Sequence, residues 1–242
     1  MGKYDRDRHY RGKILQAVPA VITAALILIC SAHEFITPVM AQAGGIAAAI
    51  DGAGYLSDVE KEVFREMNLA RTNPRKYAAF LEATLPYYQG TLLSMPGKTP
   101  LRTTEGSGAV REAITFLKNQ APRAALIPSK GMSRSARDHI KDQGPKGTMG
   151  HQGSDGSMPR ARLMRYGAIS VYGENISYGG ETAREIIMQL IIDDGVAGRG
   201  HRINMFRNNF KYAGVAVGPH AGLRVMCVID FAGKFTEGAK SI

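Results

Sequence analysis

Three short segments in the second half of the chain hold the residue types that metal binding or proton transfer requires. The segment HQGSDG begins at His151, the tripeptide GEN contains Glu174, and DDGVAGRGHR begins at Asp193 and contains His201. Imidazole and carboxylate groups bind divalent cations and exchange protons, and the glycines between them allow sharp turns. If these four side chains converge in space they form one site. If they do not, they are polar groups on separate loops.

Each candidate also has a purely structural interpretation. His151 fits a histidine on a surface turn, and Glu174 fits the cap of a helix or loop. Asp193 and Asp194 end a predicted helix, where negative charge is unfavourable, so they require either a cation or an ion pair with the arginines that follow. The residue types therefore leave both a functional and a structural role open.

The sequence excludes several other chemistries. It has no HExxH zinc motif, no GxSxG nucleophile motif and no glycine-rich phosphate loop after a predicted strand. Cys227 lies in the apolar run VMCVI, which is typical of a core strand rather than of a reactive thiol. No serine or cysteine nucleophile is indicated, so any hydrolysis would use a metal or acid–base catalysis.

The N-terminus has the layout of an export signal. Five Lys or Arg residues lie among the first 13, residues 14–32 carry no charge, and small-x-small cleavage patterns follow near residues 39–43. We expect residues 1–43 to be a cleaved signal peptide, with a membrane anchor over 14–32 as the alternative. Export places the protein in the periplasm or outside the cell. Removal of 1–43 would leave Cys227 without an intramolecular partner, which suits a bacterial exported protein.

Composition and charge describe an ordinary globular chain with a basic bias. The 242 residues are 44% hydrophobic and 21% charged, with a net charge of +10. The basic bias favours anionic partners. The sequence has no tryptophan and no recognised nucleic-acid motif, so we expect an anionic envelope surface or polymer rather than DNA or RNA.

The remaining pattern predicts helices first and antiparallel strands last, which is an α+β domain. Residues 44–56 are small and glycine-rich and are expected to be a linker. The domain is expected over 57–235, with 236–242 as a C-terminal tail. Residues 86–107 are rich in turn-forming residues and predict an exposed loop. The predicted helices lie at 57–72, 76–85, 109–121, 133–143 and 182–192, with a short basic helical turn at 158–166, and a hairpin is predicted over 212–231.

Four motifs in order resemble the CAP superfamily, which comprises the cysteine-rich secretory, antigen 5 and pathogenesis-related 1 proteins and is also called the SCP domain. They are EVFREMNLARTNP at 62–74, HQGSDGS at 151–157, GENI at 173–176 and IDDGVAGRGHR at 192–202. The motifs HQGSDGS and IDDGVAGRGHR look like the bacterial form of the domain. The resemblance covers residues 57–233, and the chain lacks the disulfides of the eukaryotic members.

This resemblance implies a three-layer α-β-α sandwich with a small antiparallel sheet and a central cleft. In the family, two histidines and two acids line that cleft and bind a divalent metal, often zinc. Carried over, these are His151, Glu174 and His201, with Asp193 in the place of a usual glutamate. The shorter aspartate makes a direct metal bond at that position doubtful, and Asp194 is the alternative. No organic cofactor is implied.

Three functions follow as hypotheses. The first is an exported binding protein whose cleft holds a divalent metal, zinc foremost, or another ligand through His151, His201, Glu174 and Asp193. The second is a metal-dependent or acid–base hydrolase of peptides or envelope polymers, with Glu174 as catalytic base. The third is a lipid- or sterol-binding protein that uses the segment 86–101. Family membership alone does not choose among them.

Overall fold

The computed structural model describes residues 44–239, which form one compact unit. The predicted signal peptide or anchor over 1–43 and the end of the predicted tail, residues 240–242, lie outside the described residues. Within residues 44–239, no helix is both long and apolar enough to cross a membrane.

Seven helices and nine strands carry labels in this part of the chain. The helices are α2 (Asp58–Thr72), α3 (Pro74–Glu82), α4 (Ser107–Asn119), α5 (Lys130–Gln143), α6 (Pro159–Met164), α7 (Ala183–Ile192) and α8 (Gly200–Phe206). The strands are β1 (Tyr88–Gln89), β2 (Leu92–Leu93), β3 (Leu101–Arg102), β4 (Ile127–Pro128), β5 (Gly167–Ile169), β6 (Tyr172–Tyr178), β7 (Tyr212–His220), β8 (Arg224–Ala232) and β9 (Phe235–Glu237).

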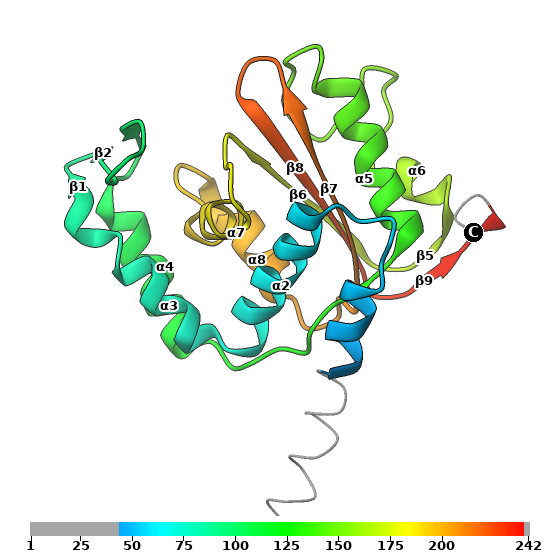
Figure 1. The fold of residues 1–242 in the computed structure, drawn as a ribbon, viewed down its shortest axis with the longest axis horizontal. Coiled ribbons are helices and arrows are strands. Elements are labelled where there is room, and N and C mark those ends of the chain that lie inside the picture. The colour runs from blue at the N-terminus through cyan, green and yellow to red at the C-terminus, as the bar shows by residue number, and fades with distance from the viewer. Residues whose placement is uncertain (1–43, 240–242) are drawn as a thin grey trace, which may run out of the picture. The chain divides into compact units, whose positions relative to one another are not determined.

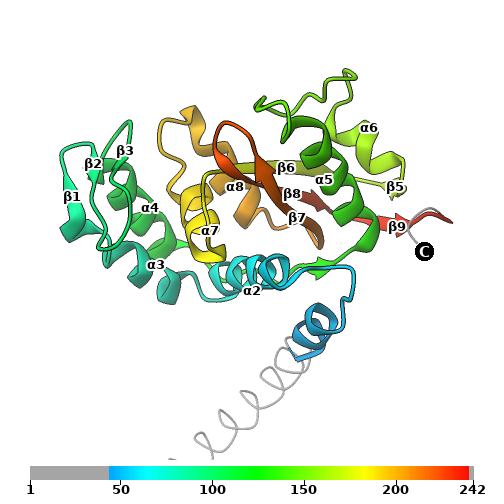
Figure 2. The same cartoon turned by 45° about the horizontal axis from the view of Figure 1, so that its top comes forward.

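The architecture is an α+β sandwich of three layers (Figure 1). The central sheet has the order β4-β7-β8-β6, with three antiparallel strands and a short parallel pairing between β4 and β7. Helix α5 packs against β7 and β8 on one face of this sheet, and α2, α7 and α8 cover the other face. Strand β6 is therefore an edge strand, with α7 and α8 beside it (Figure 2).

Local sequence signals account for the ends of the main elements. Ser57 and Glu60 form the predicted capping box at the start of α2. Pro74 occupies the first turn of α3, where its missing N–H costs nothing, and Asn73 caps that helix through its side chain. The predicted hairpin is also confirmed, as β7 and β8 pair in register from Tyr212↔Ala232 to His220↔Arg224.

The structure corrects the expectation of a linker at residues 44–56. Residues 44–51 are helical, and Ile46, Ile50 and Leu56 are buried in the main hydrophobic core. Ile46 and Ile50 are four residues apart, so they lie on one face of the helix and give it a side to bury despite its small residues. It therefore packs on the domain.

Two segments without predicted strands contain short ones. Residues 86–107, expected as a loop, hold the three-stranded sheet β1-β2-β3. The first residues of the expected tail belong to β9, which pairs with β5. The Glu237 carboxylate of β9 also accepts hydrogen bonds from Ser129 Oγ and the Gly131 amide, and so satisfies a backbone donor in the first turn of α5.

Gly214 on β7 sets how closely α5 approaches the sheet. A Cβ added at Gly214 would lie 2.1 Å from the Met132 carbonyl carbon and 2.3 Å from the Ser133 nitrogen. These are backbone atoms of α5, so no side-chain rotation can relieve the clash. The distance between α5 and the sheet thus depends on the absence of a side chain at this position.

We predict that Gly214→Ala lowers the free energy of unfolding by about 3 kcal/mol, because α5 must move away from the sheet. Gly108→Ala in α4 is the control, since an added Cβ there meets nothing within 4 Å. That variant should stay within about 1 kcal/mol of the wild type. Urea denaturation of both variants measures the difference, and equal stabilities would contradict the packing argument.

Candidate functional site

His151 and Glu174 form the first of two imidazole–carboxylate pairs. The His151 Nδ1 lies 2.8 Å from Glu174 Oε1. The glutamate side chain is 1% exposed, whereas that of the histidine is 45% exposed. Glu174 belongs to β6, and His151 lies in the loop between α5 and α6. A buried carboxylate therefore holds an exposed imidazole by one ring nitrogen.

Arg162 of α6 completes this pair from inside the protein. Its Nη2 donates to Glu174 Oε2 at 2.7 Å, and its Nη1 donates to the carbonyl oxygens of His151 and Ser157 at 3.0 and 2.8 Å. Burial acts to raise the pKa of Glu174, but the His151 hydrogen bond and the Arg162 charge outweigh it and keep this pKa below its ordinary value. Glu174 is therefore an ionised acceptor at neutral pH.

Asp193 and His201 form the second pair. The His201 Nδ1 lies 2.6 Å from Asp193 Oδ1, and the His201 amide donates to Asp193 Oδ2 at 2.9 Å. Asp193 is the C-cap of α7, with φ of 57° in the left-handed region. The Arg202 amide also approaches Asp193 Oδ2, at 3.3 Å. The carboxylate at this unfavourable helix end is thus stabilised by backbone amides and an imidazole.

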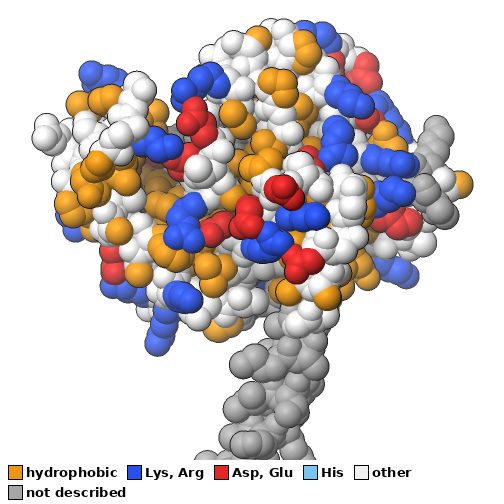
Figure 3. All heavy atoms as spheres, viewed as in Figure 1, with side chains coloured by type: hydrophobic (Ala, Val, Ile, Leu, Met, Phe, Trp, Pro, Cys, Tyr) orange, Lys and Arg blue, Asp and Glu red, His pale blue; other side chains and the backbone are white. Residues whose placement is uncertain are grey.

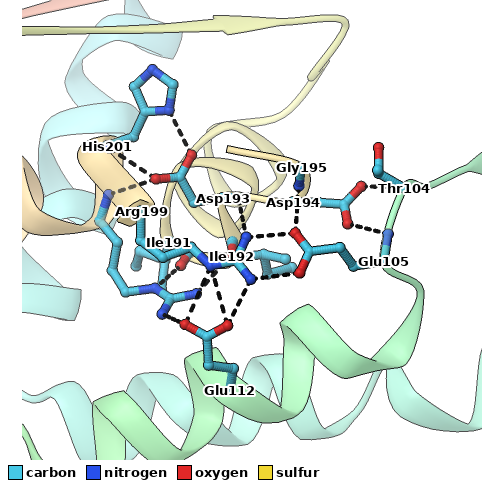
Figure 4. Close-up of polar contacts among 11 residues, drawn as sticks. Thr104, Glu105, Glu112, Ile191, Ile192, Asp193, Asp194, Gly195, Arg199 and His201 are labelled. Carbon is cyan, nitrogen blue, oxygen red and sulfur yellow. Dashed lines mark hydrogen bonds and ion pairs between the residues drawn. The ribbon is translucent and has the colours of Figure 1, made fainter. Parts of the chain in front are cut away.

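Neither Arg199 nor Arg202 pairs with the Asp193 carboxylate, so an ion pair with these arginines does not explain the acid at this helix end. Arg199 instead forms ion pairs with Glu105 and Glu112, and donates to the Asp193 carbonyl oxygen at 2.8 Å (Figure 4). Arg202 pairs with Glu112 at 2.7 Å. The arginines therefore fix the turn in which Asp193 lies and leave its carboxylate to His201.

Asp194 has a different role from Asp193. Its two oxygens accept the backbone amides of Thr104 and Glu105 at 2.6 and 2.8 Å (Figure 4). The Gly195 amide donates in turn to Glu105 Oε1 at 2.7 Å. These contacts attach the turn after α7 to the segment that leads into α4. Asp194 is thereby engaged in structure and away from His201.

The two pairs meet at consecutive residues of β6. Glu174 holds His151, and the side chain of the next residue, Asn175, donates to the His201 carbonyl oxygen at 2.9 Å. Asn204 of α8 donates to Asn175 Oδ1 at 3.0 Å and fixes the orientation of that amide. The edge strand β6 therefore supports both histidine segments, the first through Glu174 and the second through Asn175.

A second layer of buried polar groups lies beneath the first pair. Asp230 is directly opposite Glu174 in the β6–β8 pairing, is fully buried, and makes no well-aligned hydrogen bond within the described residues. Burial and then the negative charge of Glu174 raise the pKa of Asp230 well above its usual value. The burial of Asp230 and its position opposite Glu174 thus favour the neutral form of its carboxyl group.

His139 of α5 also belongs to this layer. Its Nε2 lies 2.8 Å from the Gly150 carbonyl oxygen, and its Nδ1 has no partner among the described residues. Burial lowers the pKa of His139. The ring is therefore neutral and supports the loop that carries His151.

The four predicted site residues are thus present as two pairs rather than as one cluster. Among residues 44–239, no group of three or more His, Cys, Asp or Glu side chains is arranged to hold a metal ion. Both carboxylates use their oxygens on protein donors. Each histidine donates from Nδ1 to a carboxylate, so in the neutral ring the lone pair is on Nε2. Neither Nε2 has a partner among the described residues, and each is available to bind a metal, accept a hydrogen bond or accept a proton.

Sequence reasoning missed three contributors to the site. Arg162 belongs to a basic run with Arg160 and Arg165. It is the buried member of the three, but the sequence does not distinguish it from the other two. Asn175 was part of a recognised motif but was given no role. Asp230 did carry a signal, because it is the single acid in the apolar run VMCVIDFA.

A model of the cysteine-rich secretory protein family, CAP, matches residues 97–231. The chain belongs to the CAP family. The match contains three of the four motifs that carried the resemblance, and the motif at 62–74 lies before it. Membership and the α+β sandwich are therefore confirmed. No curated protein matches this CAP chain significantly.

Solved structures similar to this CAP protein come from bacteria. One is an extracellular protein with an SCP domain from Bacillus anthracis, with 19% identity, a TM-score of 0.39, and coverage of 52% of this chain and 38% of that one. Another is an outer surface protein from Borrelia burgdorferi, with 14% identity, a TM-score of 0.37, and coverage of 44% and 76%. The chain thus spans well under half of the Bacillus anthracis protein.

We predict that Asp230→Asn stabilises this CAP domain at neutral pH. The folded pKa of Asp230 lies above its unfolded value of about 3.9, so the native state binds the extra proton between these two values. The free energy of unfolding therefore falls as pH rises through this window, by up to about 1.4 kcal/mol per pH unit from this group. Asparagine has a similar size and carries no charge, so this decrease in the free energy of unfolding does not occur in the variant.

Urea denaturation at pH 4 and pH 7 measures the effect. The gain in stability of Asp230→Asn over the wild type should be larger at pH 7 than at pH 4, by roughly 1 kcal/mol or more. An equal difference at the two pH values would show that Asp230 is ionised in the folded protein.

Proposed function

We propose that this protein is an exported CAP module of the bacterial envelope or exterior that binds its ligand through the Nε2 atoms of His151 and His201. One observation carries the proposal. Both histidines are held at Nδ1 by buried carboxylates, and both pairs are fixed to adjacent residues of β6. Two imidazoles whose tautomer and orientation are set in this way are prepared for a ligand that binds at Nε2.

A divalent metal is the first ligand to consider, and zinc is the best match to imidazole nitrogen. The residues fit it only in part. Zinc takes four donors, and catalytic sites usually supply three from the protein. Here the two Nε2 atoms would hold it, with Glu174 and Asp193 as the groups that orient the rings and increase their basicity. We therefore propose a labile zinc site whose other ligands come from water or from a bound molecule.

The N-terminal sequence supports the location. Its basic start, uncharged stretch over 14–32 and small-residue pattern are typical of a signal for export. Export to the periplasm and export to the exterior are both compatible with this pattern.

The alternative of a hydrolase that uses Glu174 as its catalytic base has less support. This carboxylate is 1% exposed and its two oxygens face His151 and Arg162, so solvent water has little access to it. Acid–base chemistry in this site would instead pass through the exposed Nε2 of His151. We therefore keep binding as the proposed function.

We predict that the mature domain binds zinc in isothermal titration calorimetry and that the variant His151→Ala/His201→Ala loses at least roughly tenfold in affinity. The double variant should still fold, because Glu174 keeps Arg162 and Asp193 keeps two backbone amides. Gln152→Ala, an exposed neighbour of His151, is the matched control and should bind zinc as the wild type does.

Two results would contradict the metal part of the proposal. One is a wild-type domain that takes up no zinc when purified without chelators. The other is equal affinity in the wild type and the double histidine variant, which would place the zinc elsewhere.

A further inference from the structure

Helix α5 presents a cationic face on the side opposite the sheet. Lys130, Arg134, Arg137 and Lys141 recur at intervals of three and four residues, which places them along one face of a helix. Met132, Ala136 and Ile140 occupy the other face and are buried against the sheet. Lys and Arg side chains gather over α5 and α6 on the right of Figure 3.

A hollow of about 340 Å³ lies on this face. It is lined by Arg134, Arg137, Asp138, Lys141 and Tyr166, which give three cationic groups, one acid and one phenol. Basic side chains are common on the surface of a chain with a net charge of +10, so charge alone does not define a site. The concave shape and the fixed donors described next distinguish this group from a solvated surface.

Arg137 is held in place by a buried carboxylate. Its Nη2 donates to Glu60 Oε1 and Oε2 at 2.8 and 2.9 Å, and the Glu60 side chain is 3% exposed. Glu60 is itself fixed by the backbone amides of Ser57 and Val217 at 2.8 and 3.1 Å. A guanidinium has five N–H donors, so an Arg137 anchored through Nη2 keeps others for a ligand.

The single acid in the hollow is also engaged. Tyr166 donates its hydroxyl hydrogen to Asp138 Oδ2 at 2.7 Å, and Arg165 Nη1 lies 3.8 Å from the same oxygen. Lys141 is exposed and forms no ion pair with any residue between 44 and 239. The balance of charge in the hollow is therefore positive, with an unpaired ammonium at its rim.

We propose that this hollow is a binding site for a phosphate group, distinct from the histidine pairs. Arginine forks match phosphate oxygens in two-point contacts, and a neighbouring ammonium adds charge to a dianionic group. The group would belong to an anionic envelope polymer or to a phospholipid headgroup, because the same donors recognise both. The site would then hold the CAP domain at an anionic surface while the histidines remain open to their own ligand.

The test measures binding of inorganic phosphate at low ionic strength by NMR titration of the intact domain. Lys141→Glu should weaken binding by at least about tenfold, and Asp138→Asn should strengthen it, because the two changes alter the charge of the hollow in opposite directions. Lys76→Glu on α3 is the matched control, since it reverses an exposed lysine outside the hollow and should leave affinity within about twofold.

Flotation with vesicles of phosphatidylglycerol and phosphatidylcholine separates the two sources of the phosphate. Charge-dependent vesicle binding assigns a lipid headgroup, and phosphate binding without vesicle binding assigns a soluble polymer. Absence of saturable phosphate binding, equal losses in Lys141→Glu and Lys76→Glu, or weaker binding by Asp138→Asn would overturn the proposal. Zinc binding in all these variants should match the wild type, so failure here is distinguishable from failure of the histidine site.

Discussion

The buried ion pair between Glu174 and Arg162 is the interaction on which the site depends. Both side chains are almost fully excluded from solvent, at 1% and 2% exposure, so each charge is tolerable only because the other is present. Arg162 also donates to the carbonyl oxygens of His151 and Ser157. One guanidinium from α6 thus fixes the strand that holds the acid and the loop that holds the histidine.

The pair of Asp193 and His201 also holds an imidazole by Nδ1, but other contacts stabilise its carboxylate. The Asp193 carboxylate is stabilised by the amides of His201 and Arg202 rather than by a buried cation. The turn that makes those amides available is held by Arg199 and its ion pairs to Glu105 and Glu112. Two unrelated supports therefore present two imidazoles in the same way, with Nδ1 bound and Nε2 open, which is why we place ligand contact at Nε2.

Much of the fold followed from local sequence signals. The capping box of Ser57 and Glu60, the break at Asn73–Pro74 and the C-terminal hairpin depend on residues close in sequence, and all three are confirmed. Strand β6 was not predicted, because its sequence YGENISY has polar groups where a core strand would carry apolar ones. Its polar side chains Glu174, Asn175 and Ser177 are buried all the same, since hydrogen bonds to α6, α8 and α7 satisfy them.

The sequence predicted four site residues but not how they are arranged. His151, Glu174, Asp193 and His201 were read as one ligand set because imidazole and carboxylate both bind metals. Their division into pairs depends on Arg162, on the amides that follow Asp193, and on Asn175, none of which sequence spacing relates to the histidines. Long-range contacts of this kind are set by tertiary packing, and one sequence contains no record of them.

The tautomeric state of the two histidines tests the central claim most directly. Long-range ¹H–¹⁵N NMR spectra of the domain at neutral pH distinguish a ring protonated at Nδ1 from one protonated at Nε2. We predict that neutral His151 and His201 both carry their proton on Nδ1, donated to Glu174 and Asp193, with a bare Nε2. Protonation of either ring at Nε2 alone would show that its carboxylate does not orient it, and would contradict the proposed ligand-binding arrangement.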